Sequence, residues 1–143
     1  MKLNFSKKLT LYQIMAISIG LVYLWFGALK FFPGSSPAEG IAIDTIDRLT
    51  FGFIPSNISI ILLAIWETAV GILLILNIFK RFAIYLALVH MVFTFSPLFL
   101  FPDLTFTQLP FSFTLLGQYI VKNIAFIAAL FILLFENRKI VKV

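Results

Sequence analysis

Four segments of about 20 apolar residues divide this chain, and no other feature of the sequence limits its fold so strongly. They cover residues 10–32, 58–79, 82–101 and 115–135. An α-helix rises about 1.5 Å per residue, so each segment can cross a hydrocarbon core about 30 Å thick. We therefore expect an all-α membrane protein, a bundle of four transmembrane helices that run up and down in turn, as one domain over residues 1–143.

The composition agrees with a chain surrounded by lipid. Hydrophobic residues make up 62% and charged residues 12%, whereas a soluble domain has about half and about a quarter. Cysteine is absent, which excludes disulfides, CxxC redox chemistry, iron–sulfur ligation and a thiol nucleophile.

Basic residues gather on one side of the expected bundle. Of the eleven lysines and arginines, eight flank the chain ends and the turn between spans 2 and 3: Lys2, Lys7, Lys8, Lys80, Arg81, Arg138, Lys139 and Lys142. The opposite side holds the acidic Glu39, Asp44, Asp47 and Asp103. The positive-inside rule then predicts a bacterial inner (plasma) membrane protein with cytoplasmic N- and C-termini. The net charge of +5 reflects this topology, so we expect the lipid bilayer, and no nucleic acid, as partner.

The two loops on the opposite, outer side differ in pattern. Residues 38–50 have helical apolar spacing, and Ser36 to Glu39 resembles a capping box, which predicts a short amphipathic helix at the outer interface. That helix either packs over the mouth of the bundle or forms a lid over a cavity. In residues 102–114, alternating Phe with Thr and Ser predicts an extended loop that folds back onto the helix ends.

Four ionisable residues lie within the apolar segments: Lys30, Glu67, His90 and Lys122. Helical rise places Lys122 about 10 Å and Glu67 about 15 Å from the outer ends of their spans, and His90 near the midplane. Lys30 is expected close to the outer surface, where its stem could snorkel. Because a buried carboxylate and ammonium can neutralise each other, we predict that Glu67 pairs with Lys122.

Span 4 carries a polar stripe, since Gln118 with Lys122 and Tyr119 with Asn123 are both i,i+4 pairs. One hypothesis is a polar pocket in the outer half of the bundle. Its candidate residues are the four ionisable side chains, the stripe and the nearby aromatics: Lys30, Glu67, His90, Gln118, Tyr119, Lys122, Asn123, Trp25 and Trp66. The alternative is that these residues only make interhelical contacts, worth about 0.6 kcal/mol each.

Enzyme signatures are missing from the sequence. It has no GxSxG, no HExxH and no phosphate-binding glycine loop. One histidine and one intramembrane carboxylate make a poor metal site, and haem ligation by paired histidines is excluded. We therefore predict no catalytic residues and no metal, and expect that the protein is not an enzyme on its own.

Three short stretches resemble motifs of the DoxX-like membrane family, and together the resemblance covers nearly the whole chain. They are WFGALKFFP at residues 25–33, Glu67 with Gly71, and GQY at residues 117–119 continuing to Lys122 and Asn123. The resemblance implies a four-helix membrane bundle associated with redox physiology, since some relatives are subunits of quinone-linked sulfur oxidation and others accompany detoxification systems. The residues that match the family's polar pattern are Lys30, Glu67, Lys122 and Asn123.

Two functional hypotheses follow. In the first, the pocket binds a quinone-like or other lipophilic ligand, and a membrane or periplasmic redox partner completes the system. In the second, the protein is a non-catalytic subunit or assembly factor whose polar residues lock the helices together. A transporter or proton relay has less support, because four helices without a discontinuous pair make a thin transporter. The oligomeric state stays open.

Overall fold

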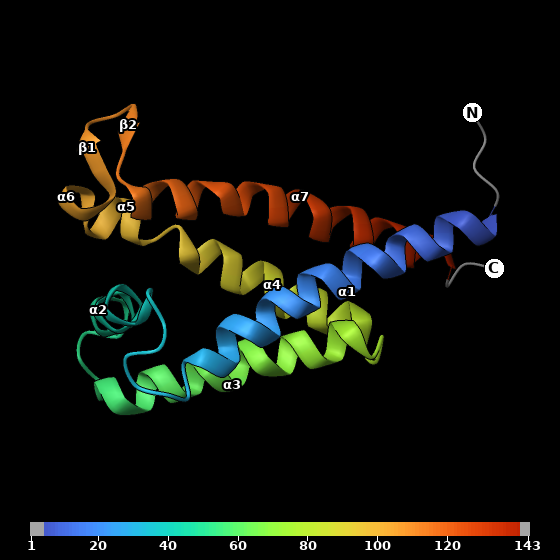
Figure 1. The fold of residues 1–143 in the computed structure, drawn as a ribbon, viewed down its shortest axis with the longest axis horizontal. Helices are drawn as coiled ribbons and strands as arrows, with labels where there is room; N and C mark the ends of the chain where they lie inside the picture. The colour runs from blue at the N-terminus through green and yellow to red at the C-terminus, as the bar shows by residue number, and fades with distance from the viewer. Residues whose placement is uncertain (1–4, 141–143) are drawn as a thin grey trace.

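Four long helices make up most of the molecule (Figure 1): α1 (Phe5–Leu29), α3 (Ser56–Ile75), α4 (Lys80–Thr94) and α7 (Leu115–Ile140). This computed structural model describes the backbone of residues 5–140 and the side chains of residues 11–135. Within that part of the chain, four stretches are long and apolar enough to cross a membrane. The predicted all-α, four-helix membrane fold is confirmed.

The helix ends differ from the expected spans at several places, three of them at a turn or break between the long helices. α1 ends at Leu29, because Lys30 begins a tight turn in which its N–H donates to the carbonyl of Gly27 at 3.1 Å. α3 ends at Ile75, so the turn before α4 covers residues 76–79. The third span is interrupted after Thr94 and continues as α5 (Pro97–Leu100), since proline has no N–H to continue the helical ladder.

The four helices pack mainly as two antiparallel pairs, α1 on α3 and α4 on α7, with α3 also against α4. The α1–α3 pair is held very close. A Cβ at Gly71 of α3 would lie 2.6 Å from the backbone nitrogen of Leu24 in α1, so only glycine fits there. Small residues at a helix interface allow such an approach in membranes.

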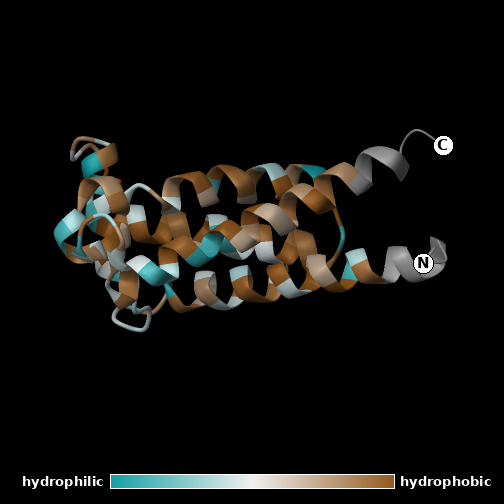
Figure 2. Ribbon diagram, turned by 90° about the horizontal axis from the view of Figure 1, so that it is seen from above, coloured by the Kyte–Doolittle hydropathy of each residue, from teal (hydrophilic) through white to brown (hydrophobic). Residues whose placement is uncertain are grey.

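The apolar core occupies the half of the bundle nearest the α3–α4 turn. Its residues are Ala16, Ile19, Tyr23, Val70, Leu74, Ala83, Ile84, Ala87, Met91, Leu130, Leu133 and Leu134. Figure 2 shows apolar residues along the whole length of the four helices, with hydrophilic ones mostly at the end that carries the loops. Many large apolar side chains also point outward, as expected for helices surrounded by lipid.

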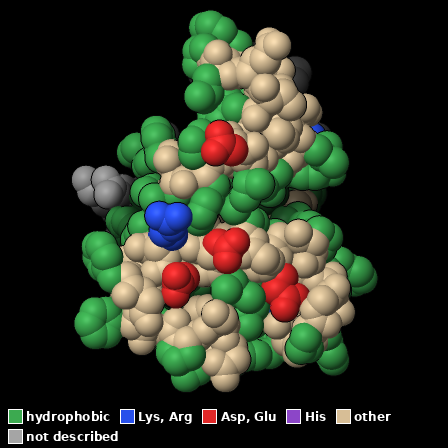
Figure 3. Space-filling model, turned by 90° about the vertical axis from the view of Figure 1, so that its left-hand side faces the viewer, with side chains coloured by type: hydrophobic (Ala, Val, Ile, Leu, Met, Phe, Trp, Pro, Cys, Tyr) green, Lys and Arg blue, Asp and Glu red, His purple; other side chains and the backbone are tan. Residues whose placement is uncertain are grey.

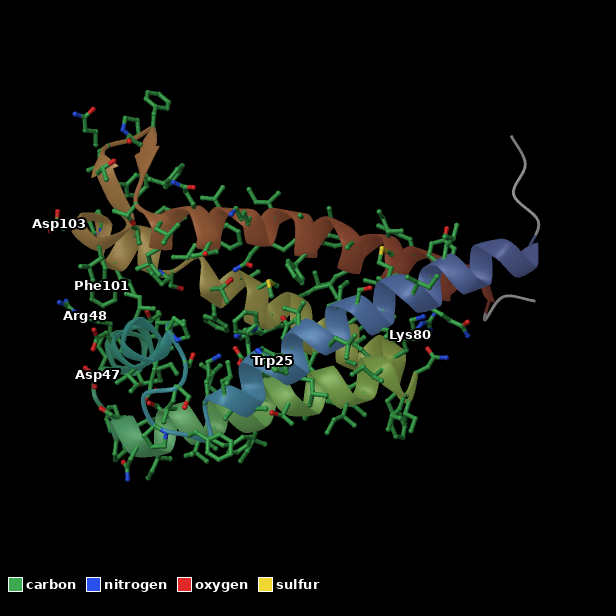
Figure 4. The ribbon with its side chains drawn as sticks, in the orientation of Figure 1. Trp25, Asp47, Arg48, Lys80, Phe101 and Asp103 are labelled. Carbon is green, nitrogen blue, oxygen red and sulfur yellow. The ribbon has the colours of Figure 1, made fainter. Side chains whose placement is uncertain are left out.

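The loop end is the end of the bundle that carries α2 (Glu39–Leu49), α5, α6 (Pro102–Thr105) and the strands β1 (Phe106–Gln108) and β2 (Ser112–Phe113). α2 confirms the expected short helix. It runs across the bundle axis in Figure 1 and contacts α3 and α5. The guanidinium carbon of Arg48 lies 5.6 Å from the ring centroid of Phe101, and this contact ties α2 to the end of α5 (Figure 4).

The predicted capping box at the start of α2 is wrong. The helix begins at Glu39 after Ala38, and no side chain caps it. Glu39 does reach back, but its Oε2 accepts from the N–H of Gly34 at 2.7 Å and not from Ser36. The cap residue stands two positions later than the sequence pattern indicated, at Ala38 and not at Ser36, so the serine hydroxyl is out of register with the first turn.

The second outer loop is part helix and part hairpin. α6 precedes β1, which pairs antiparallel with β2, and the rings of Phe106 and Phe113 lie 4.8 Å apart. The base packs on α7, where a Cβ at Gly117 would overlap the carbonyl oxygen of Thr105. The tip projects away from the helices, and Phe111 is 90% exposed. The prediction that this loop folds back onto the helix ends is therefore confirmed for the base of the hairpin. It is wrong for the tip of the hairpin.

The described charged loop residues divide between the two ends. Four acidic residues and Arg48 lie at the loop end: Glu39, Asp44, Asp47 and Asp103 (Figure 3). Lys80 and Arg81 begin α4 at the opposite end, where the described backbone also starts and finishes. Six basic residues of the predicted cytoplasmic side lie outside the residues whose side chains are described: Lys2, Lys7, Lys8, Arg138, Lys139 and Lys142.

Candidate functional site

A carboxylate at the centre of the bundle joins three of the four long helices. Glu67 of α3 is 6% exposed. Its Oε2 accepts a hydrogen bond from Nζ of Lys30 at 2.6 Å, and its Oε1 faces Nε2 of His90 in α4 at 3.3 Å. A buried carboxylate is tolerated where charged or polar donors complete its hydrogen bonds, as they do here.

Lys30 is the cationic partner of Glu67, and it is buried rather than snorkelling. The residue is 5% exposed, and its Nζ also donates to the carbonyl oxygen of Phe26 at 3.2 Å. The turn that follows Leu29 directs the side chain back along α1 and toward α3. The expectation that Lys30 lies near the surface is wrong, because a side chain at the end of a span can point back into the bundle.

His90 extends the cluster to a tyrosine that was not among the candidate residues. Its Nδ1 lies 3.1 Å from the hydroxyl of Tyr23, which also lies 3.1 Å from the carbonyl oxygen of Ala87. A tyrosine hydroxyl has one proton, so it donates either to this carbonyl or to Nδ1. The first arrangement suits an imidazole protonated on Nδ1, and the second suits the neutral ring with its proton on Nε2, facing Glu67.

Close packing of α1 on α3 positions the pair. Gly27 stands one turn before Lys30, and a Cβ there would lie 2.7 Å from the backbone nitrogen of Thr68 and 2.9 Å from Cβ of Glu67. The two backbones can approach this closely only because residue 27 has no side chain. The sequence contains a hint of this close approach, since Gly27 lies within the same stretch as Lys30, at residues 25–33.

Lys122 does not pair with Glu67, so that prediction is wrong. Its side chain is exposed, and its Nζ lies 5.0 Å from the ring centroid of Tyr119. α7 packs mainly on α4, not on α3, where Glu67 lies. Helical rise gives only the position of a residue along its helix, and it does not determine which way the side chain points.

The polar stripe of α7 divides between the inside and the outside of the bundle. Asn123 points to α4, where its Nδ2 donates to Oγ1 of Thr94 at 3.2 Å. Gln118, Tyr119 and Lys122 are exposed. Thr94 was not a candidate, although it lies one helical turn after His90 and shares its face.

The two tryptophans do not enclose the cluster. Trp25 is 69% exposed, and Trp66 is 37% exposed with its Nε1 donating to the carbonyl oxygen of Leu86 at 3.3 Å. The structure thus brings together Lys30, Glu67 and His90, adds Tyr23, and leaves the remaining candidates outside the cluster.

Most polar atoms of the cluster have hydrogen-bond partners. The ammonium has two acceptors, and both carboxylate oxygens and both imidazole nitrogens face partners. Among the side chains of residues 11–135, no three of His, Cys, Asp or Glu are placed to hold a metal ion. Such an arrangement holds helices together well and offers few free atoms to a ligand. No protein-family model, curated protein or solved structure matches this chain.

Proposed function

We propose that this small membrane protein is a non-catalytic subunit or assembly factor of a membrane complex, in which the cluster of Lys30, Glu67, His90 and Tyr23 locks the helices together. One observation carries the proposal. The carboxylate of Glu67 is bonded from one side by the residue after α1 and from the other by α4, and the three side chains are only 5%, 8% and 13% exposed.

The physical reason is the difference between forming a buried ion pair and breaking one. A formed pair contributes little net stability, because both charges were removed from water. Removing one partner leaves the other charge buried and costs about 3–5 kcal/mol. A cluster of this kind therefore allows only one arrangement of α1, α3 and α4.

The environment and associations of the protein belong to the same proposal. We place it in a bacterial plasma membrane with cytoplasmic termini, on the distribution of basic residues in the sequence and the positive-inside rule. Membership of the DoxX-like family and a redox-associated complex, with a membrane or periplasmic partner, rest on the resemblance of residues 25–33, 67–71 and 117–123.

A second candidate function is binding of a quinone-like lipophilic ligand. The observation that favours it is the exposed polar row of Gln118, Tyr119 and Lys122, which lies in the half of α7 nearest the loop end. These groups could hydrogen-bond a ligand oxygen beside the ring of Tyr119. The cluster around Glu67 would then support the bundle and would not touch the ligand.

Extraction of bound lipophiles tests the structural role of the cluster. Wild type and the uncharged pair Lys30→Met/Glu67→Gln are purified in mild detergent, and the quinone content of organic extracts is measured per mole of protein. We expect equal contents, since the cluster has few free atoms to offer a ligand. A stoichiometric quinone in the wild type that disappears from a folded double variant would contradict the proposal.

A further inference from the structure

Lys122 is a charged residue at a position of α7 where lipid is expected around the bundle. It lies about two turns into α7, roughly 10 Å from the start of the helix, with its side chain exposed. A lysine at the bilayer centre costs about 2.5–3.5 kcal/mol, and a long stem lowers this cost by carrying the ammonium toward the headgroups. Gln118, one turn nearer the loop end, is exposed beside it. α7 thus presents a polar patch with one positive charge, formed by Lys122 and Gln118, to the surroundings of the bundle.

A groove begins one turn further along the same face of α7. It runs between α1 and α7, has a volume of about 220 Å³, and is lined by Ser18, Ile19, Val22, Ala125, Phe126 and Ala129. The hydroxyl of Ser18 donates to the carbonyl of Ile14 at 2.9 Å, so the lining is apolar in effect. For comparison, an apolar cavity of about 150 Å³ holds a benzene molecule.

The patch and the groove form one continuous surface. Lys122 precedes Ala125 and Phe126 by about one turn, and i,i+3 and i,i+4 neighbours share a helix face. α1 runs in the opposite direction, so Trp25 follows Val22 by one turn toward the same loop end. The two helices diverge toward that end in Figure 1. The surface therefore has a cationic end near the loops and an apolar end near the bundle centre.

We infer that this surface binds a phospholipid with an anionic headgroup, taken from the leaflet at the loop end. The headgroup lies at Lys122 and Gln118, and one acyl chain lies in the groove between α1 and α7. Charge complementarity selects this occupant over a neutral quinone. A second copy of the chain fits less well, because the described spans contain a single carboxylate, Glu67, which is already buried and paired.

Native mass spectrometry of protein released from vesicles tests the inference. The vesicles contain equal amounts of phosphatidylglycerol and phosphatidylcholine, and the class of lipid retained by each protein molecule is counted. We expect one retained phosphatidylglycerol with about fivefold preference over phosphatidylcholine, the factor that one lysine near the headgroups provides. Lys122→Gln abolishes the preference, while Lys122→Arg, which keeps the positive charge, retains it.

The groove is tested with a matched pair of alanines on α7. Ala125→Leu fills the groove and should reduce retention of either lipid, whereas Ala128→Leu adds the same volume at an exposed position outside the lining. Equal retention of the two lipids by the wild type would overturn the inference. So would loss of binding in Ala128→Leu to the same extent, or a quinone in place of the lipid. The outcome is independent of the locking role proposed for Glu67, since none of these substitutions touches the cluster.

Discussion

Replacing Gly27 by alanine should open the contact that aligns Lys30 with Glu67. The added Cβ would lie 2.7 Å from the backbone nitrogen of Thr68, 2.8 Å from its hydroxyl and 2.9 Å from Cβ of Glu67. Because a backbone atom stands on the other side, α1 and α3 have to separate. Lys30 lies one turn further on, so the separation lengthens its bond to the carboxylate.

The magnitude follows from three contributions. Overpacking costs about 1–3 kcal/mol, and a hydrogen bond to a charged group contributes about 1.5–3 kcal/mol. Alanine recovers about 1 kcal/mol of helix propensity relative to glycine. We therefore expect Gly27→Ala to lower the free energy of unfolding by about 1.5–5 kcal/mol, measured by denaturant titration in detergent with circular dichroism.

Gly40→Ala is the matched control, because an added Cβ at Gly40 of α2 meets no atom within 4 Å. It should be neutral or slightly stabilising. The Gly27 substitution should also cost less in a Lys30→Met background, where there is no ion pair left to misalign. Equal effects of the two alanine substitutions, or an unchanged cost in that background, would refute the role assigned to the α1–α3 contact.

Three further substitutions separate strong contacts from weak ones, each measured as the change in unfolding free energy. Tyr23→Phe leaves Nδ1 of His90 without its hydroxyl partner and should cost about 1–3 kcal/mol. An unchanged unfolding free energy would contradict this bond. Asn123→Leu removes one interhelical hydrogen bond to α4 and should cost about 0.6 kcal/mol, and a loss as large as that of Tyr23→Phe would contradict its minor role. Arg48→Ala removes the cation–π contact with Phe101 and should cost about 0.5–1 kcal/mol. It should also speed proteolysis of α2. An unchanged rate of proteolysis would argue against the tether between α2 and α5.

Hydropathy was sufficient to predict the four-helix architecture. A segment of about 20 apolar residues has few alternatives to a spanning helix, since a backbone in lipid must satisfy its own hydrogen bonds. The helix ends were less predictable. Pro97 interrupts the third span and the turn at Lys30 shortens the first, and both depend on local backbone hydrogen bonds that average hydropathy does not register.

Lys30, Glu67 and His90 of the predicted site do lie together, but the predicted partner of Glu67 was wrong. Lys122 and Asn123 are neighbours in sequence, yet one is exposed and the other bonds to Thr94, because successive residues of a helix point about 100° apart. Which of them faces the bundle depends on the partner helix of α7. That partner, α4, is selected by packing between segments far apart in the sequence.

The alternatives for α2 depend on the same packing. α2 contacts α3 and α5 and is tethered through Arg48, which supports the interpretation that it packs over the mouth of the bundle. The amphipathic pattern of residues 38–50 identified the helix correctly. It contained no information about the aromatic ring of Phe101, which belongs to a segment far along the chain.

A double-mutant cycle between Lys30 and Glu67 tests the central claim most directly. Lys30→Met and Glu67→Gln should each lower the unfolding free energy by about 3–5 kcal/mol, and the double variant should lose much less than their sum. Lys122→Met is the matched control, and its effect should add to that of Glu67→Gln without coupling. Additive losses for Lys30 with Glu67, or a strong coupling of Lys122 with Glu67, would contradict the lock described here.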